Sequence, residues 1–232
     1  MRNATGLFLF LSPMATFKRI VAKRSTEQFS IIPYAMTLLN CLLAAWYGLP
    51  FITRNNYLIS AINTAGVVIE TTYVLIFLLF APKTEKARIL RLLACVFVLF
   101  SAIALVSIFA FHKEKQRRLV CGFALTISSI TMYASPLLVM RVVIRTKSVE
   151  YMPFLLSLCV FLCATCWLIY GLIGKDIFII VPNSLGSVFG AMQLTLYAIY
   201  CKNKGGIKKP TMDGFLENGL NNSFDLQKLP NY

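Results

Sequence analysis

The chain carries one series of short motifs twice, in the same order. The first copy is Ser12-Pro13, Ser25-Thr26-Glu27, Pro33, Tyr47-Gly48-Leu49 and Asn63-x-x-Gly66, and the second is Ser135-Pro136, Ser148-Val149-Glu150, Pro153, Tyr170-Gly171-Leu172 and Asn183-x-x-Gly186. The Ser-Pro, Ser-x-Glu and Tyr-Gly-Leu pairs are 123 positions apart, whereas the Pro33/Pro153 and Asn63/Asn183 pairs are 120 apart. The chain therefore consists of two similar halves, with small gaps between the motifs.

Both halves are too apolar for an ordinary soluble domain. Hydrophobic residues make up 58% of the 232 residues and charged residues 14%, against about 45–50% and about 25% in soluble domains. A helix needs roughly 20 apolar residues to cross a bilayer. The predicted fold class is an all-α membrane protein with seven transmembrane helices, at about 4–17, 30–51, 57–81, 89–111, 119–143, 152–173 and 177–200.

These spans group as three, one and three, which predicts the domain organisation. The segments are a first triple-helix bundle (1–81), linker helix 4 with its flanking loops (82–118), a second triple-helix bundle (119–200) and a disordered cytosolic tail (201–232). Duplicated sets of broken membrane helices are typical of transporters, whose halves rock around a site held between them. The duplication therefore predicts transport by alternating access.

The first span is short for a membrane crossing, with only about 12 suitable residues between Thr5 and Thr16. A signal peptide is one explanation. We prefer another, because the duplication makes this stretch the partner of residues 130–144. We expect the amino end to lack one or two turns of helix, which puts its competence for transport in question.

The distribution of Lys and Arg predicts an amino end outside and a tail in the cytosol. With that orientation the inner segments hold 15 basic residues and the outer segments 7, in agreement with the positive-inside rule. The basic 112–118 loop is the exception, and we expect only local pairing with Glu114 there. The net charge of +14 includes no basic stripe with interleaved aromatics, so no nucleic-acid partner is predicted.

The sequence predicts no metal, no cofactor and no enzymatic activity. Cys163-x-x-Cys166 has no second pair and no neighbouring His, so the cysteines are interpreted as small apolar residues. No acid pair or activated nucleophile appears within the spans. Glu70 is the one clear acid inside a span and it is not repeated. Because coupling to protons or sodium usually employs buried carboxylates, we expect a neutral solute that moves down its own gradient.

Four prolines at matched positions, Pro13, Pro33, Pro136 and Pro153, are interpreted as hinges. Proline inside a helix removes one backbone hydrogen bond and kinks the helix. In a membrane such kinks are tolerated mainly where protein or a cavity surrounds them. The alternative is that these prolines simply mark helix ends.

The candidate binding residues are two matched asparagines and one tryptophan. Asn63 and Asn183 offer donors and acceptors without a charge, which suits a neutral solute rich in hydroxyl groups. Their alternative role is an interhelical hydrogen bond. Trp167 aligns with Ala44, so one half offers a flat ring that suits a pyranose face where the other offers a methyl. The alternative role of a tryptophan is anchoring at the membrane interface.

Longer stretches resemble the plant SWEET sugar transporters, above all their hexose-preferring first clade. The resemblance covers about residues 3–203 and is carried by Lys18-Arg19, Lys23-Arg24-Ser25-Thr26-Glu27, residues 39–50, Tyr133-Ala134-Ser135-Pro136 and residues 149–154. It implies two parallel triple-helix bundles joined by the fourth helix, with the helix order rearranged inside each bundle. Parallel repeats are already the known architecture of this family.

The same resemblance implies bidirectional, uncoupled transport of mono- or disaccharides, with glucose and related hexoses first. Asn63, Asn183 and Trp167 match sugar-binding positions, and Ala44 stands where similar members often carry serine. The four prolines match a tetrad that lets the bundles close, and Tyr47 and Asp176 match the outer gate. Thr64 and Ser184 follow the two asparagines where glycine is usual. Members form oligomers, often trimers, in the plasma membrane, and close relatives lie in the vacuolar membrane.

Two alternatives stay open. One is a non-transporting oligomer partner, which follows if the first helix is incomplete. The other is a PQ-loop-like exporter of another small neutral solute, which shares the three-one-three plan. Such an exporter is expected to carry Pro-Gln where this chain has Pro33-Tyr34 and Pro153-Phe154.

Overall fold

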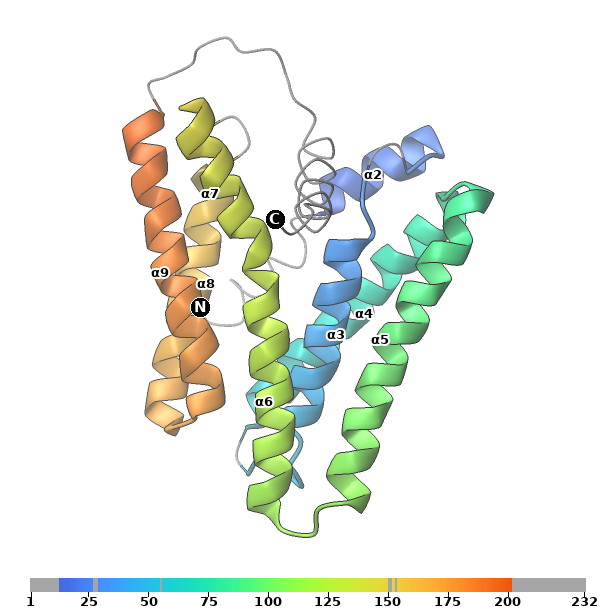
Figure 1. Ribbon diagram of the computed structural model, residues 1–232, viewed down its shortest axis with the longest axis vertical. Helices are drawn as coiled ribbons and strands as arrows, with labels where there is room; N and C mark the ends of the chain where they lie inside the picture. Colours follow the sequence, from blue (N-terminus) through green and yellow to red (C-terminus); the bar gives the residue numbers. More distant parts are fainter. Residues whose placement is uncertain (1–12, 27–28, 55, 150–151, 153, 202–232) are drawn as a thin grey trace, which may run out of the picture.

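The computed structural model describes residues 13–26, 29–54, 56–149, 152 and 154–201, and the regular structure in these segments is helical throughout. The predicted all-α class is therefore confirmed. The helices are α2 (Met14–Lys23), α3 (Ile32–Tyr47), α4 (Tyr57–Phe80), α5 (Lys83–Phe109), α6 (Glu114–Met132), α7 (Ala134–Thr146), α8 (Phe154–Gly174) and α9 (Ile177–Tyr200) (Figure 1). Helices α6 and α7 follow each other through Tyr133 and together make one bent span.

The predicted spans and the observed helices differ mainly at charged ends. Helix α5 begins at Lys83 instead of residue 89, and α6 begins at Glu114 instead of residue 119. Lys, Arg and Glu favour helix, and their long side chains reach water from a membrane edge, so each helix extends beyond its apolar part. The first predicted span, 4–17, lies mostly outside the described residues. Its described end was predicted too early, because α2 continues to Lys23.

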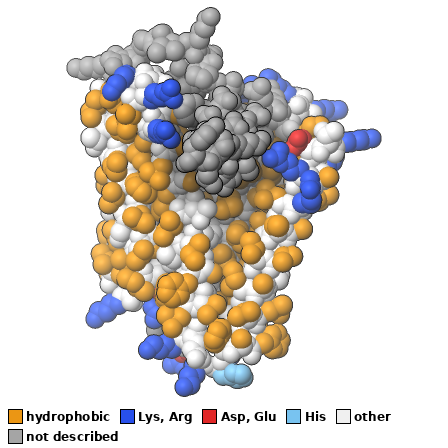
Figure 2. All heavy atoms as spheres, in the orientation of Figure 1, with side chains coloured by type: hydrophobic (Ala, Val, Ile, Leu, Met, Phe, Trp, Pro, Cys, Tyr) orange, Lys and Arg blue, Asp and Glu red, His pale blue; other side chains and the backbone are white. Residues whose placement is uncertain are grey.

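The surface of the helices is that of a protein surrounded by lipid. Five helical segments are long and apolar enough to cross a membrane: Tyr57–Phe80, Lys83–Phe109, Glu114–Thr146, Phe154–Gly174 and Ile177–Tyr200. The shorter apolar helix Ile32–Tyr47 lies among them. Figure 2 shows apolar side chains along the helices, with Lys and Arg gathered at both ends. So many exposed large apolar side chains would be a liability in water and are expected in a bilayer.

Each half has the same internal order of helices. In the first half α4 contacts both α2 and α3, and in the second half α9 contacts both α7 and α8. The halves meet where α3 packs on α6, while α6 packs on α9 within the second half and α5 packs on α3 and α6. The predicted segment limits at 81/82 and 118/119 stay a prediction, and the predicted tail, 202–232, lies outside the described residues.

Three of the four matched prolines lie at helix starts, not within helices. Pro13 precedes α2 as its N-cap, Pro33 is the second residue of α3, and Pro136 is the third residue of α7. The first turn has no intrahelical N–H bond to lose, so Pro13 and Pro33 are placed as in the alternative in which they mark helix starts. The role of the prolines as hinges stays a prediction. Pro136 instead follows the bend between α6 and α7. Pro153 lies outside the described residues.

The proline that does lie inside a helix is Pro182 of α9. Because its nitrogen has no hydrogen, the carbonyl of Phe178 loses its usual partner four residues on. The hydroxyl of Thr126 on α6 donates to that carbonyl at 3.4 Å. A side chain of a neighbouring helix thus compensates the break, as a membrane interior requires.

The glycine of each Tyr-Gly-Leu motif allows two helices to approach closely. A Cβ added at Gly48 would lie 2.6 Å from the backbone nitrogen of Ser60, and one added at Gly171 would lie 3.1 Å from that of Ile180. Ser60 and Ile180 are themselves 120 residues apart. The duplicated motif therefore packs the second helix of each half against the start of the third.

We predict that Gly48→Ala destabilises the protein. The added methyl meets backbone that cannot rotate away, and overpacking of this kind costs about 1–3 kcal/mol. For a chain of this size the loss corresponds to a Tm lower by roughly 3–10 °C, measurable by thermal unfolding of the detergent-purified protein. Gly174→Ala is the control, because nothing lies within 4 Å of its added Cβ. Equal melting temperatures for both variants would show that the approach at Gly48 is not tight.

Candidate functional site

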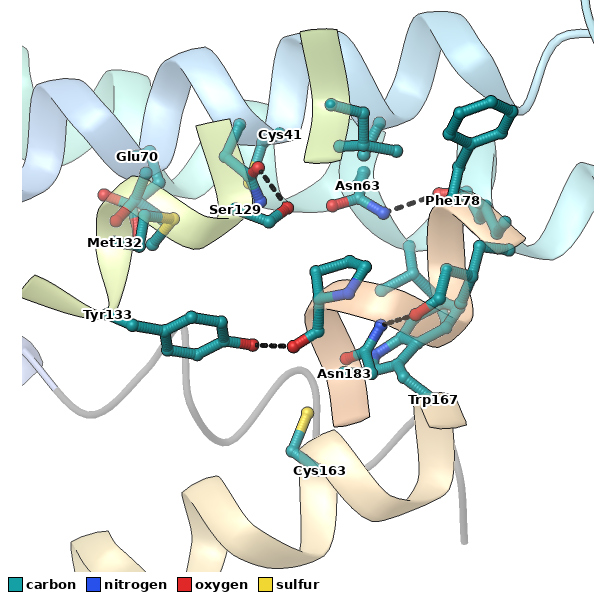
Figure 3. Close-up of a pocket in the computed structure, with 18 of the residues that line it drawn as sticks. Cys41, Asn63, Glu70, Ser129, Met132, Tyr133, Cys163, Trp167, Phe178 and Asn183 are labelled. Carbon is teal, nitrogen blue, oxygen red and sulfur yellow. Dashed lines mark hydrogen bonds between the residues drawn. The ribbon is translucent and has the colours of Figure 1, made fainter. Parts of the chain in front are cut away.

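A cavity of about 530 Å³ lies between the two halves, within the range of about 300–1,000 Å³ found for small-molecule sites. Helices of both halves contribute to its wall (Figure 3). The four residues predicted to bind substrate all line it, and so do two of the predicted hinge prolines: Asn63, Asn183, Trp167, Ala44, Pro13 and Pro33. Pro136, Tyr47 and Asp176 are not part of its wall.

The two asparagines are held in the same way. The Nδ2 of Asn63 donates to the carbonyl of Ile59 at 2.9 Å, and the Nδ2 of Asn183 donates to that of Ile179 at 2.8 Å. These bonds fix each side chain against its own helix. They leave the Oδ1 and the second N–H of both amides without a partner among the described residues. Donors and acceptors from both halves are thus available in one cavity.

An aromatic ring stands on one side of the cavity and a methyl group at the matched position. Trp167 packs edge-on against Tyr170, with ring centroids 5.5 Å apart and planes at 83°. This contact limits rotation of the indole. Ala44 contributes the methyl on the wall. Trp46, by contrast, donates from Nε1 to the Oγ of Ser107 at 3.1 Å and does not line the cavity.

Sequence reasoning missed several polar groups of the wall. Asn40 accepts a hydrogen bond from Ser129 at 2.9 Å, and Tyr133 donates to the carbonyl of Pro182 at 2.7 Å. A Cβ at Gly186 would lie 2.4 Å from the Tyr133 hydroxyl, so the glycine of the repeated motif leaves room for it. Asn40 is an amide in an apolar span, and this signal was enough to propose it as a site residue from the sequence. Ser129 and Tyr133 have no identical residue at the matched position of the first half, so the repeat did not indicate them as site residues.

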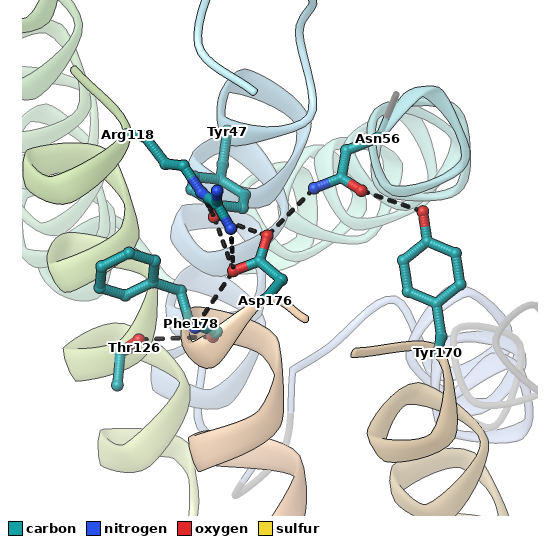
Figure 4. A network of polar contacts seen from close by, with 7 residues as sticks. All are labelled: Tyr47, Asn56, Arg118, Thr126, Tyr170, Asp176 and Phe178. Atoms are coloured by element: carbon teal, nitrogen blue, oxygen red, sulfur yellow. Dashed lines mark hydrogen bonds and ion pairs between the residues drawn. The ribbon is translucent and has the colours of Figure 1, made fainter. Parts of the chain in front are cut away.

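One end of the molecule is closed by a network between the halves. Its residues are Tyr47, Asn56, Arg118, Tyr170 and Asp176, here called the cross-half network (Figure 4). The Tyr47 hydroxyl lies 2.9 and 2.7 Å from the two carboxylate oxygens of Asp176. Asn56 donates to Asp176 at 3.1 Å, and Tyr170 donates to Asn56 at 3.1 Å. The two predicted gate residues are therefore in direct contact.

The network joins matched residues of the two repeats. Tyr47 and Tyr170 are 123 residues apart, and Asn56 and Asp176 are 120 apart. Tyr47 is the last residue of α3, and Tyr170 lies four residues before the end of α8. Each tyrosine bonds the residue that precedes the third helix of the other half. One matched position carries an amide and the other an acid, so the pair forms a hydrogen bond where two carboxylates would repel.

Arg118 supplies the positive charge of this network. Its Nη2 lies 3.3 Å from Oδ1 of Asp176, and its Nε donates to the Tyr47 hydroxyl at 3.3 Å. Asp176 is 2% exposed, and a buried carboxylate requires such compensation. Arg118 is in the first turns of α6, a stretch predicted as a basic loop with only local pairing to Glu114. The pairing expected for Glu114 comes from Arg54, at 3.0 Å.

Chemically, the site suits an uncharged polar solute. Glu70 is the one Asp, Glu, Lys, Arg or His among the described residues that line the cavity. In the described part of the chain no group of three or more potential metal ligands gathers. The wall offers amide groups, hydroxyls and an indole face in an apolar surround.

Comparisons with known proteins agree with this geometry. The family model MtN3_slv, described as "Sugar efflux transporter for intercellular exchange", matches residues 2–85 and 119–205. The bidirectional sugar transporter SWEET1 of Arabidopsis thaliana is 61% identical over 203 residues, which cover 88% of this chain and 82% of that protein. SWEET1b of Oryza sativa subsp. indica is 62% identical over 205 residues, covering 88% and 78%.

A solved structure of a eukaryotic SWEET transporter shares the fold. Its TM-score is 0.83 at 44% sequence identity, and the match covers 87% of this chain and 94% of that one. The family model falls on the two repeats and omits the linker between them. The chain is a multi-pass membrane protein and belongs to the MtN3/SWEET family.

Proposed function

We propose that this chain is a bidirectional, uncoupled transporter of sugars, with glucose and related hexoses as its substrates. The observation that carries the proposal is the cavity between the halves, whose wall presents the free amide groups of Asn63 and Asn183 beside the ring of Trp167. The relatives named as bidirectional sugar transporters support it.

The proposed roles follow from the chemistry of a pyranose. Sugar hydroxyls both donate and accept, and so do the carboxamides. The apolar face of the ring packs on the indole of Trp167, while the methyl of Ala44 bounds the space at the matched position. An unpaired solute charge would be costly in this surround, so the cavity favours neutral sugars.

Transport by alternating access requires that the two ends open in turn. We assign the gate at one end to the cross-half network, which is closed in the structure. Opening that end separates Tyr47 from Asp176 and Tyr170 from Asn56. The other end is assigned to the helix joints near Pro13, Pro33, Pro136 and Pro153, of which Pro13 and Pro33 line the cavity.

The distribution of basic residues supports an amino end outside, a cytosolic carboxyl end and a cross-half network on the outer face. The plasma membrane is the proposed location. We further propose that the chain assembles as a homo- or hetero-oligomer with other family members.

One prediction concerns the side-chain amides of Asn63 and Asn183. In yeast that lacks hexose carriers, the chain supports uptake of radiolabelled glucose, and Asn63→Ala or Asn183→Ala reduces it by tenfold or more. The reason is the loss of two hydrogen bonds to the sugar, each contributing roughly 1 kcal/mol. Uptake persists after the proton gradient is collapsed, because no coupling ion is involved.

The matched control is Gln116→Ala, which removes an exposed carboxamide far from the cavity wall and leaves uptake unchanged. Surface abundance is measured for every variant. A chain that reaches the surface and moves no glucose would overturn the proposed function and leave the non-transporting partner or another solute.

Another prediction concerns the cross-half network. Asn56→Asp places a second carboxylate beside Asp176, and two such charges 4 Å apart repel by about 4 kcal/mol at an effective dielectric constant of 20. The gate then no longer closes, and glucose uptake falls by tenfold or more. The swap Asn56→Asp with Asp176→Asn restores one acid and one amide, so uptake recovers in part.

Glu114→Gln is the control, since it removes a partly exposed acid at the same end of the molecule and leaves uptake unchanged. If the swapped double variant transports no better than Asn56→Asp alone, the amide–acid pair is not what the gate requires.

A further inference from the structure

Glu70 lies on the cavity wall two helical turns beyond Asn63 on α4. Residues seven apart share one face of a helix, and seven residues rise by about 10 Å. Figure 3 shows Glu70 beside Met132, with Cys41 and Ser129 between it and the asparagines. The cavity thus has a second polar position, separate from the amide pair.

The carboxyl group of Glu70 has an unused acceptor. The residue is 3% exposed, and its Oε2 makes no hydrogen bond with any described residue. Buried polar atoms are nearly always paired, and an unpaired buried acceptor costs about 1–3 kcal/mol, more when the group is charged. Within the described wall no Lys, Arg or His stands opposite it. The described residues therefore leave this acceptor without a donor.

The second half has no counterpart to this group. The residue 120 positions after Glu70 is Gly190, where an added Cβ would lie 2.9 Å from the Cα of Phe161. Neither an acid nor space for one exists there. Pro13 and Tyr34 line the same cavity, and Tyr73, three residues after Glu70, stacks on Phe17 of α2. Glu70 therefore lies between the amide pair and the end of the molecule where α2 packs.

We propose that Glu70 is a second binding site on the transport path, and that it lets this cavity take amino sugars. Their ammonium group pairs with the Glu70 carboxylate once the side chain turns toward the solute, since Oε2 itself is buried in this arrangement. The inference rests on the proposed sugar transport. An ammonium supplies both the hydrogen bond and the charge that a buried carboxylate lacks. A divalent cation fits less well, because such ions take six or more oxygen ligands and Glu70 is the single carboxylate of the described wall.

The test compares glucose with glucosamine, its 2-amino derivative, at a pH below the pKa of the amine. Uptake of both radiolabelled sugars is measured in the same yeast for the wild type and for Glu70→Gln, which keeps the shape of the side chain and removes its charge. The wild type transports both sugars. In Glu70→Gln the ratio of glucosamine to glucose uptake falls roughly fivefold, the difference between a hydrogen bond to a charged group and a neutral one.

The ratio is independent of expression and folding, which affect both sugars equally. Glu85→Gln, at an exposed acid outside the cavity, leaves the ratio unchanged. An unchanged ratio in Glu70→Gln, or glucose uptake without glucosamine uptake in the wild type, overturns the role of Glu70 and leaves the proposed function intact. If the wild type moves neither sugar, the proposed function fails. Glu70 is then judged by whether glucosamine raises the Tm of the purified wild type and not that of Glu70→Gln.

Discussion

A buried carboxylate at the junction of the halves needs partners from several helices at once. Asp176 caps α9 by accepting from the backbone nitrogen of Phe178 at 3.2 Å. It also receives Tyr47 from α3, Asn56 from the start of α4 and Arg118 from α6. Asp176 is almost fully buried, so these groups replace the water that an exposed carboxylate would bind. The closed arrangement of helices therefore depends on satisfying one charge, and any opening must separate that charge from protein groups and expose it to water.

The duplication explains the framework, while the differences between matched positions explain the site. Identical residues recur where the two halves need the same geometry, as at Gly48 and Gly171 or at the paired amides. Matched positions carry different residues at several places where the halves face each other. An amide bonds an acid at Asn56 and Asp176, and an indole and a methyl group line the cavity at Trp167 and Ala44. A strictly symmetric pair would place like charges in contact or fill the cavity with two rings.

The sequence alone predicted the helical class, most of the spans and four of the residues that line the cavity, Asn63, Asn183, Trp167 and Ala44. Those predictions rest on composition, on length and on the repeat, all of which are local or periodic signals. Helix starts were predicted less well, because α5 and α6 begin with charged residues that hydropathy excludes. The position of the prolines within their helices was also hard to predict. Pro13, Pro33 and Pro136 begin helices, and a residue pattern does not distinguish a first turn from a helix interior.

Residues that act through a partner in the other half were the hardest to foresee. Arg118 belongs to a basic stretch, and its role depends on Asp176, 58 positions later in the chain. Pro182 removes one backbone hydrogen bond inside α9, and Thr126 of α6 donates to the freed carbonyl of Phe178. Glu70 was correctly singled out as the one acid within a span. Its lack of a matched acid in the second half argued against a role in ion coupling. That lack has a physical cause, because the matched residue, Gly190, packs directly against Phe161 and leaves no room for a side chain. An acid on one side only is what a path with distinct ends requires, because a solute then meets different groups on approaching the amide pair from the two directions.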